Sequence, residues 1–273
     1  MHDVAKTSKS LGGFTLLELS VVVLVVTLLI GGLLIPLSTQ VEQRNVSDTN
    51  LRLAQARDAL IGFAIAHGRF PCPATVSSPP QPTDVGVEDP PTGTGVCNHP
   101  IDGYLPGTTL GLTNLDSQGF VLDAWGLQQN RIRYSITNAT VNTVANAFTV
   151  PNGLRNAGIP ALGNSANTYL YVCASSTGTT ATACSAIVPP TPDPNALARG
   201  DAVFVIYSLG KNAATSGGTS PDEALNQKST TNTTPVFVSK TASGQAGSEF
   251  DDVVSWGSRY GVISQLSAAG QLP

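Results

Sequence analysis

Charged side chains are scarce in this chain of 273 residues. Only 12% of the residues are Asp, Glu, Lys or Arg, and the formal net charge is -4 with a pI near 5.2. Binding to nucleic-acid phosphates needs a cluster of Lys and Arg, and the few basic residues here are scattered along the chain. The sequence therefore makes a nucleic-acid partner unlikely.

Catalytic motifs are also lacking. The chain has no GxSxG elbow, no HExxH zinc motif, no GxxxxGK[ST] phosphate loop and no GxGxxG after a strand. Its three histidines lie far apart, at His2, His67 and His99. We therefore predict that the protein is not an enzyme and holds no cofactor.

The four cysteines contain no CxxC pair, which argues against a zinc site. They are Cys72, Cys97, Cys173 and Cys184, all beyond the apolar N-terminal segment. An even number of cysteines on an exported chain predicts disulfides, for which three connectivities exist. Proximity in sequence favours Cys72 with Cys97 and Cys173 with Cys184, and free buried thiols are the alternative.

The longest uncharged apolar stretch lies near the N-terminus. No charge occurs between Glu18 and Glu42, and residues 19–41 are rich in Leu, Val and Ile. As a helix this stretch reaches about 34 Å, against about 30 Å for the core of a bilayer. We predict a membrane span, with Lys6 and Lys9 on its cytoplasmic side and the rest of the chain exported.

The residues before this stretch form the sequence Gly12-Gly13-Phe14-Thr15-Leu16-Leu17-Glu18. This order resembles the N-terminus of type IV pilins and pseudopilins; a generic anchor helix is the alternative. The resemblance implies that a prepilin peptidase cleaves between Gly13 and Phe14 and methylates the new N-terminus. It also implies that Glu18 pairs with the terminal amine of a neighbouring subunit during assembly.

Helical periodicity continues beyond the apolar stretch. Small and apolar side chains recur every three or four residues at Leu53, Ala56, Leu60 and Ala64, which is typical of an amphipathic helix. Gly68 and Pro71 are expected to end this helix near His67.

The remainder reads as loops and short strands. Residues 71–106 are rich in Pro, Gly and Thr, which predicts a long surface loop. Five β-like runs follow, at residues 131–136, 168–172, 202–208, 235–239 and 260–263, and they suggest an antiparallel sheet. Residues 122–126 and 250–256 also resemble pseudopilin segments. The expected fold is α+β and pilin-like, with a long N-terminal helix, transmembrane and then amphipathic, packed on that sheet.

One metal hypothesis arises from the acidic residues of the C-terminal part. Major pseudopilins bind calcium in a loop comparable to the one that holds Asp222 and Glu223, and Asp251 and Asp252 follow downstream. Calcium takes six to eight oxygen ligands, which carboxylates and loop carbonyls could supply. The alternative is that these are ordinary solvated acids of turns.

Together these features predict four parts: a leader (residues 1–13), a transmembrane assembly helix (14–41), the amphipathic half of the helix (42–70) and an exported domain (71–273). The expected function is that of a minor pilin or pseudopilin, assembled into a type IV pilus or a type II secretion pseudopilus. A tip adhesin or uptake receptor mounted on a pilin helix is the alternative. The expected partners are other subunits, the prepilin peptidase and the inner-membrane assembly platform. The expected location is the bacterial inner membrane, with a periplasmic C-terminal domain, and then the fibre or cell surface.

Overall fold

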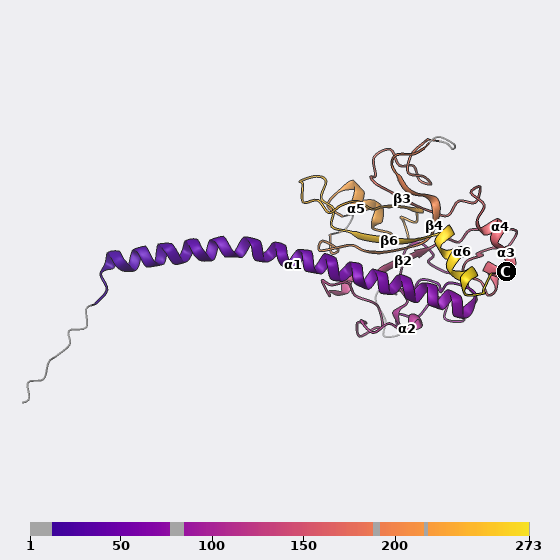
Figure 1. Cartoon of the computed structure of the whole chain (residues 1–273), viewed down its shortest axis with the longest axis horizontal. Helices are drawn as coiled ribbons and strands as arrows, with labels where there is room; N and C mark the ends of the chain where they lie inside the picture. Colours follow the sequence, from indigo (N-terminus) through magenta and orange to yellow (C-terminus); the bar gives the residue numbers. More distant parts are fainter. Residues whose placement is uncertain (1–12, 77–84, 188–191, 216–217, 273) are drawn as a thin grey trace, which may run out of the picture. The chain divides into compact units, whose positions relative to one another are not determined.

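The computed structural model describes residues 13–76, 85–187, 192–215 and 218–272, without the side chains of residues 31–38. Most of the predicted leader and part of the Pro-rich loop, residues 77–84, lie outside the described residues. The chain divides into two compact units, Met1–Arg44 and Asn45–Pro273. Helix α1 (Leu16–His67) begins in the first unit and ends in the second (Figure 1).

The second part of α1 has the buried face that its periodicity predicts. Leu53, Ala56, Leu60 and Ala64 are at most 1% exposed and pack into a core that includes Phe204. Burying one leucine side chain contributes about 1.5–3 kcal/mol to the stability of the fold. The helix ends at His67 because Gly68 takes the left-handed conformation, with a φ of 68°, that closes helix C-termini.

A six-stranded sheet forms the centre of the second unit. Its longest strand, β4 (Ala196–Ser208), pairs with three other strands. The other strands are β1 (Gly103–Tyr104), β2 (Arg133–Ile136), β3 (Leu170–Cys173), β5 (Val236–Val238) and β6 (Val253–Ser258).

Two strands share one edge of β4. Val205 pairs with Ser135 of β2 and also with Trp256 of β6, so β2 and β6 lie on opposite edges. Ala202 pairs with Leu170 of β3 and also with β6, so β3 lies on the same edge as β2. Strands β2 and β3 therefore follow one another along β4, and the edge changes partner between Phe204 and Ala202.

The expected fold class, α+β with an antiparallel sheet, is wrong. The fold is mixed α/β with a curled sheet: β3 and β5 run parallel, whereas the other pairs are antiparallel. The strand expected at residues 260–263 lies instead in helix α6 (Arg259–Ala268). Ser258 caps this helix, because its hydroxyl accepts a hydrogen bond from the Gly261 amide.

The expected membrane span also needs correction. The described residues contain no helix with both the length and the apolar character that crossing a membrane requires. The transmembrane helix and the single-pass inner-membrane location predicted from residues 19–41 are therefore wrong.

Short helices connect the strands, and two disulfides close the loops. The helices are α2 (Gly107–Leu110), the 3₁₀ helix η1 (Gln128–Asn130), α3 (Gly153–Ala157), α4 (Ile159–Leu162) and α5 (Pro221–Asn226). The favoured pairing of cysteines is confirmed, since Cys72 is bonded to Cys97 and Cys173 to Cys184. In the chain-entropy model, each disulfide that closes a loop of this length stabilises the fold by about 3 kcal/mol. Disulfides are also compatible with an extracellular location.

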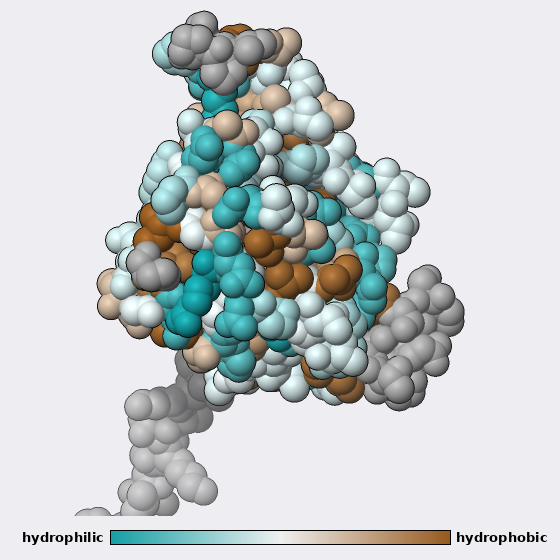
Figure 2. All heavy atoms as spheres, turned by 90° about the vertical axis from the view of Figure 1, so that its right-hand side faces the viewer, coloured by the Kyte–Doolittle hydropathy of each residue, from teal (hydrophilic) through white to brown (hydrophobic). Residues whose placement is uncertain are grey.

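Both faces of the sheet are covered. Along β4, Phe204 and Ile206 join the core that contains α1, while the alternate residues Val205 and Tyr207 join a second cluster with Phe237. The outer surface is different in character. Figure 2 shows one face of the second unit on which hydrophilic and intermediate residues surround small, separate hydrophobic patches.

Candidate functional site: the apolar start of α1

The predicted cleavage junction is exposed. Gly13, Phe14 and Thr15 precede the first helical residue without regular secondary structure, and Phe14 is 82% exposed. A Cβ atom added at Gly13 would meet nothing within 4 Å. The bond between Gly13 and Phe14 is thus sterically accessible to a peptidase, and Gly12 lies outside the described residues.

Glu18 occupies the first turn of α1. The Thr15 hydroxyl accepts a hydrogen bond from the Glu18 amide at 3.2 Å, and the Thr15 carbonyl accepts one from the Leu19 amide. A Thr followed three residues later by Glu is the sequence pattern of a helix capping box. Glu18 therefore has a local role in addition to the predicted pairing, because its negative charge stabilises the N-terminus of the helix.

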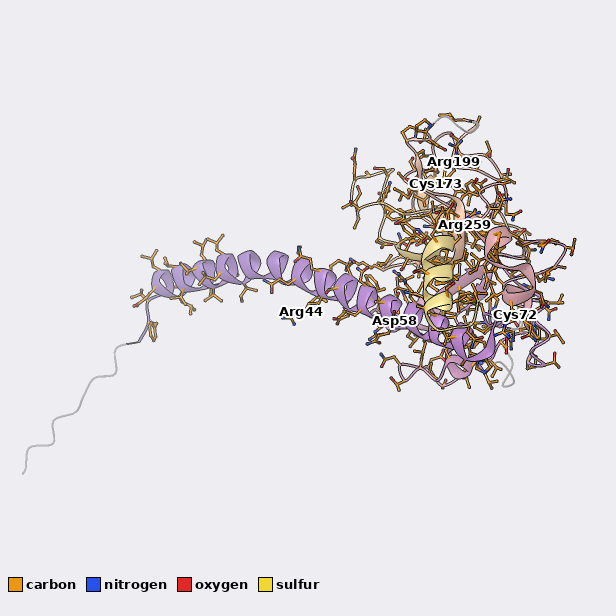
Figure 3. All side chains as sticks on the ribbon, turned by 45° about the vertical axis from the view of Figure 1, so that its right-hand side comes forward. Arg44, Asp58, Cys72, Cys173, Arg199 and Arg259 are labelled. Atoms are coloured by element: carbon orange, nitrogen blue, oxygen red, sulfur yellow. A yellow bond between two sulfur atoms is a disulfide. The ribbon has the colours of Figure 1, made fainter. Side chains whose placement is uncertain are left out.

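Apolar side chains surround the first part of α1 on every side (Figure 3). Successive helical residues are rotated by about 100°, so the unbroken run from Val21 to Val26 covers the whole circumference. The exposed large apolar residues are 45–87% accessible and comprise Phe14, Leu16, Leu17, Leu19, Val21, Val22, Val23, Leu24, Val25, Val26, Leu28, Leu29 and Ile30.

The hydroxyl groups within this segment are turned inward to the backbone. Ser20 donates to the Leu17 carbonyl at 2.7 Å, and Thr27 donates to the carbonyls of Val23 and Leu24 at 3.0 and 2.8 Å. These bonds leave the helix surface apolar except for Glu18. A helix that is apolar all round requires apolar neighbours all round, and a carboxylate enclosed among them requires a counter-charge.

The loop at residues 122–126 attaches to the second part of α1. The Arg52 guanidinium donates to the Leu122 carbonyl at 2.8 Å and also to the Asp123 carbonyl. The Ala124 amide donates to the Thr49 hydroxyl at 3.1 Å. This polar clamp complements the apolar face of the helix described above.

Asp123 is the centre of this loop, and the sequence analysis did not identify it as a site residue. Its carboxylate accepts hydrogen bonds from the Trp125 amide at 2.9 Å, from Asn130 Nδ2 at 3.1 Å and from the Ser208 hydroxyl. Burial raises the pKa of Asp123, and these hydrogen bonds offset only part of the rise. The Asp-x-Trp-Gly segment is the sequence feature that points to Asp123. The role of Asp123 is to hold this loop in place through its hydrogen bonds.

Three of the four acids proposed for calcium lie together. The carboxylates of Glu223, Asp251 and Asp252 offer oxygens within 4.8 Å of one another. Burial raises the pKa of Asp252, the Asn226 amide lowers it, and the neighbouring negative charges raise it further. Glu223 and Asp252 are buried, whereas Asp251 is partly exposed, so the alternative of ordinary solvated acids does not describe the whole cluster.

Asp222 is separate from this cluster. It forms an ion pair with Lys240, and it accepts a hydrogen bond from the Ser176 amide at 2.6 Å. Burial acts to raise the pKa of Asp222, but the hydrogen bonds from Lys240 and Ser176 lower it on balance. Its carboxylate thus ties α5 to two other segments.

Glu223 anchors the loop between β4 and α5. One of its oxygens accepts from Asn212 and the Asp251 amide, and the other accepts from Asn212 and from both the amide and the hydroxyl of Thr219. A carboxylate has about four acceptor positions, so these are filled. The donor set falls short of the six to eight oxygens that calcium takes, and calcium binding stays a prediction that titration must test.

We expect Glu223→Gln to destabilise the protein whether or not calcium is present. The substitution removes the charge and turns an amide donor toward the donors of Asn212 and Thr219, which costs about 2–4 kcal/mol. Calorimetry of both chains with calcium chloride and with EGTA would measure this. A higher melting temperature of the wild type in calcium, abolished by Asp251→Asn, would contradict our interpretation of the cluster as a loop anchor.

Within the described residues, the geometry gathers no nucleophile, base and orienting acid into a catalytic arrangement. The features of the chain with functional potential are the junction at Gly13, Glu18 with the apolar segment behind it, and the acidic cluster. Comparison with known proteins adds nothing further, because no family model, no protein of curated function and no solved structure matches the chain.

Proposed function

We propose that this protein is a pilin-like structural subunit, trimmed after Gly13 by a prepilin peptidase and assembled into a fibre through the start of α1. The observation that carries the proposal is the helix surface at residues 16–30, which is exposed and apolar on all sides. Leaving the twelve large apolar side chains of this surface in water would be strongly unfavourable, since each contributes about 1.5–3 kcal/mol when buried. A bundle of equivalent helices from other subunits covers such a surface completely.

Charge complementarity supports the same assembly. Glu18 is the only formal charge between Phe14 and Glu42, and no ion pair in the described residues involves it. Cleavage after Gly13 would create a second charge, the amine of Phe14, on an equally apolar helix end. In a bundle of staggered helices, the amine of one subunit neutralises Glu18 of the next and so sets their register.

The fibre is a type IV pilus or a type II secretion pseudopilus. Two disulfides and a polar, weakly charged surface suit a subunit whose second unit faces the exterior of the fibre. The N-terminal part of α1 supplies the axis of assembly, and the second unit supplies whatever distinguishes this subunit from the others.

Mass spectrometry of the protein from its native host is expected to show a mature chain beginning at Phe14 with a methylated amine. The reason is the exposed junction at Gly13, followed by a stable helix start at Thr15. A mature chain that begins at Met1, or one cut beyond residue 30, would contradict the proposal.

The Gly13→Val variant provides a control for this test. Because a Cβ atom at Gly13 meets no neighbour, the substitution is expected to leave the fold unchanged. Loss of cleavage in this variant, with an unchanged circular dichroism spectrum, would report recognition of the junction itself. Normal cleavage would show that another protease acts.

A further inference from the structure

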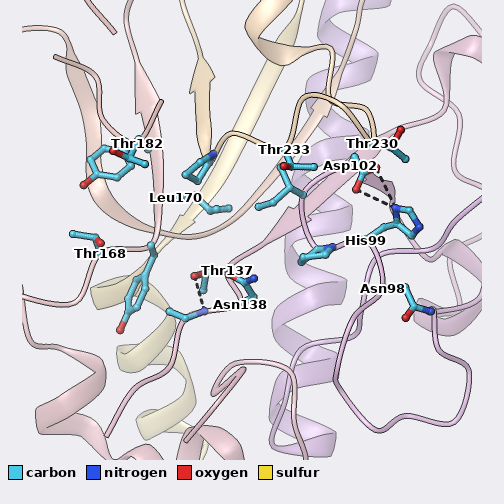
Figure 4. A pocket seen from close by; sticks show the side chains of 16 residues that line it. Asn98, His99, Asp102, Thr137, Asn138, Thr168, Leu170, Thr182, Thr230 and Thr233 are labelled. Carbon is cyan, nitrogen blue, oxygen red and sulfur yellow. Dashed lines mark hydrogen bonds and ion pairs between the residues drawn. The ribbon is translucent and has the colours of Figure 1, made fainter. Parts of the chain in front are cut away.

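A cavity of about 550 Å³ opens beside the sheet of the second unit (Figure 4). It lies where the edge of β4 changes partner, between the residues that follow β2, including Thr137, and the start of β3 at Leu170. Its volume is within the range of about 300–1,000 Å³ that is usual for sites of small ligands.

The two disulfides hold segments that line this cavity. Residues 98–102 follow Cys97 directly, and Thr182 lies within the loop closed by Cys173 and Cys184. The other walls come from residues 137–139, residues 168–171 and the segment before β5, with Thr230 and Thr233. Cross-links beside two of the lining segments help the cavity to keep its shape without a ligand, which lowers the entropic cost of binding.

The lining is nearly free of charge. Of the described residues that form it, only His99 and Asp102 belong to the basic and acidic residue types, and these two bind each other at 3.1 Å. The Asp102 side chain is only 7% exposed. A strongly charged ligand would find no unpaired counter-charge in this lining. We therefore expect the ligand to be uncharged where it contacts the cavity.

Hydroxyl groups dominate the mouth of the cavity. Thr168, Thr182, Thr230 and Thr233 are exposed, and within the described residues their hydroxyls form no hydrogen bond to protein. Figure 4 shows Thr168 and Thr182 on one side of the cavity and Thr230 and Thr233 on the other. Each hydroxyl can both donate and accept, as the hydroxyls of a sugar do.

Part of the buried lining is apolar and aromatic. Ile101 and Leu170 belong to the second core cluster, and Tyr169 and Tyr171 flank Leu170. Apolar carbon surface below a ring of uncommitted hydroxyls matches a ligand whose faces are C–H and whose rim is O–H. We propose that this cavity binds a neutral oligosaccharide.

A peptide is a less suitable occupant. Recognition of an extended peptide uses an unpaired strand edge, and at the outer edge of β5 the Asn226 side chain already binds both the amide and the carbonyl of Val238. The edge of β4 next to the cavity is occupied by β2 and β3. The backbone therefore offers a peptide no strand to pair with at this position.

The test uses the purified full-length chain and saturation-transfer NMR with lactose, maltotriose and tri-N-acetylchitotriose. Sialyllactose, a heparin tetrasaccharide and a mixture of short peptides are the comparison ligands. We expect saturable binding of at least one neutral oligosaccharide, with affinity lowered about tenfold or more in a Thr168→Val, Thr233→Val double variant that loses two hydrogen bonds. The Thr241→Val variant, which alters an exposed threonine outside the lining, is expected to bind normally.

Three results would overturn the proposal. They are the absence of saturable binding to all neutral sugars at millimolar concentration, preferential binding of the anionic sugars or peptides, and an unchanged affinity in the double variant. Valine matches threonine in shape, so a folding defect is not expected, and a circular dichroism spectrum would verify this. Trimming at Gly13 and fibre assembly are expected to be normal in the double variant, so this test is independent of the proposed function.

Discussion

The Glu18→Ala variant is expected to be trimmed after Gly13 like the wild type and yet to be almost absent from fibres. In the proposed bundle, the amine of Phe14 from one subunit lies against Glu18 of its neighbour. Removing one member of a buried pair costs about 3–5 kcal/mol because the other charge stays unpaired. Since each 1.4 kcal/mol is a factor of ten, incorporation should fall by roughly a hundredfold or more.

A loss of assembly in Glu18→Ala could also result from the loss of the helix cap. Two further variants separate this explanation from the loss of the charge pair. Glu18→Gln keeps a residue that suits the third position of a capping box but removes the charge. Thr15→Ala removes the hydroxyl that accepts from the Glu18 amide and keeps the charge. If pairing with the neighbouring amine governs assembly, Glu18→Gln should fail and Thr15→Ala should assemble.

The measurement is an immunoblot of sheared fibres and of cells for each variant, with total protein as the reference. Normal recovery of Glu18→Gln in the fibre fraction would contradict the pairing role of the carboxylate. Loss of Thr15→Ala but not of Glu18→Gln would show instead that the start of the helix must be capped.

Features encoded over a few neighbouring residues were predictable from the sequence. The face with Leu53, Ala56, Leu60 and Ala64 is buried because apolar spacing alone determines which side of a helix meets a core. The disulfide pairing followed from proximity, since short loops close most readily. The capping pattern of Thr15 and Glu18 is likewise encoded within four residues.

Other features depend on contacts between distant segments. The run at residues 260–263 looks like a strand, but the cap at Ser258 and the packing of Val262 and Leu266 make it helical. The parallel pairing of β3 and β5 joins residues 65 positions apart, such as Tyr171 and Val236, which no local pattern specifies. The membrane span was predicted from the composition of residues 19–41, whereas no helix of the described residues combines the length and apolar character needed to cross a membrane.

The acidic residues show a similar limit. Sequence placed Asp222, Glu223, Asp251 and Asp252 in one group, and only the last three meet. Which carboxylate meets a lysine and which meets an amide depends on the path of three loops. Burial itself, which raises the pKa values of Asp123 and Asp252, is set by the whole fold.

Lys228 is the clearest case of such hidden burial. It is 3% exposed, and its ammonium group donates to the Val236 carbonyl at 2.6 Å and the Thr234 hydroxyl at 3.1 Å. The group lies 4.5 Å from the centre of the Phe237 ring. With the Asn226 side chain, it occupies the outer edge of β5. Burial lowers the pKa of Lys228 to about 7.

The free energy of unfolding is therefore expected to rise between pH 7 and pH 9.5. In this window the unfolded lysine, with a pKa of about 10.4, keeps its proton while the folded one has lost it. The unfolded state then binds more protons, so stability increases with pH, by up to about 3 kcal/mol over the window. Well below pH 7 both states are protonated and the contribution of Lys228 is constant.

Urea denaturation of the wild type and of Lys228→Met at several pH values would measure this effect. The raised pKa of Asp252 has the opposite effect, because a carboxyl group whose pKa is higher in the folded state lowers the free energy of unfolding as the pH rises. The informative quantity is therefore the difference in unfolding free energy between the wild type and Lys228→Met. Lys211→Met, which removes an exposed lysine, is the matched control and should follow the wild type. If the difference between the wild type and Lys228→Met is independent of pH from 7 to 9.5, then the ammonium group at the edge of β5 has an ordinary pKa, and its two hydrogen bonds and the Phe237 ring compensate fully for its burial.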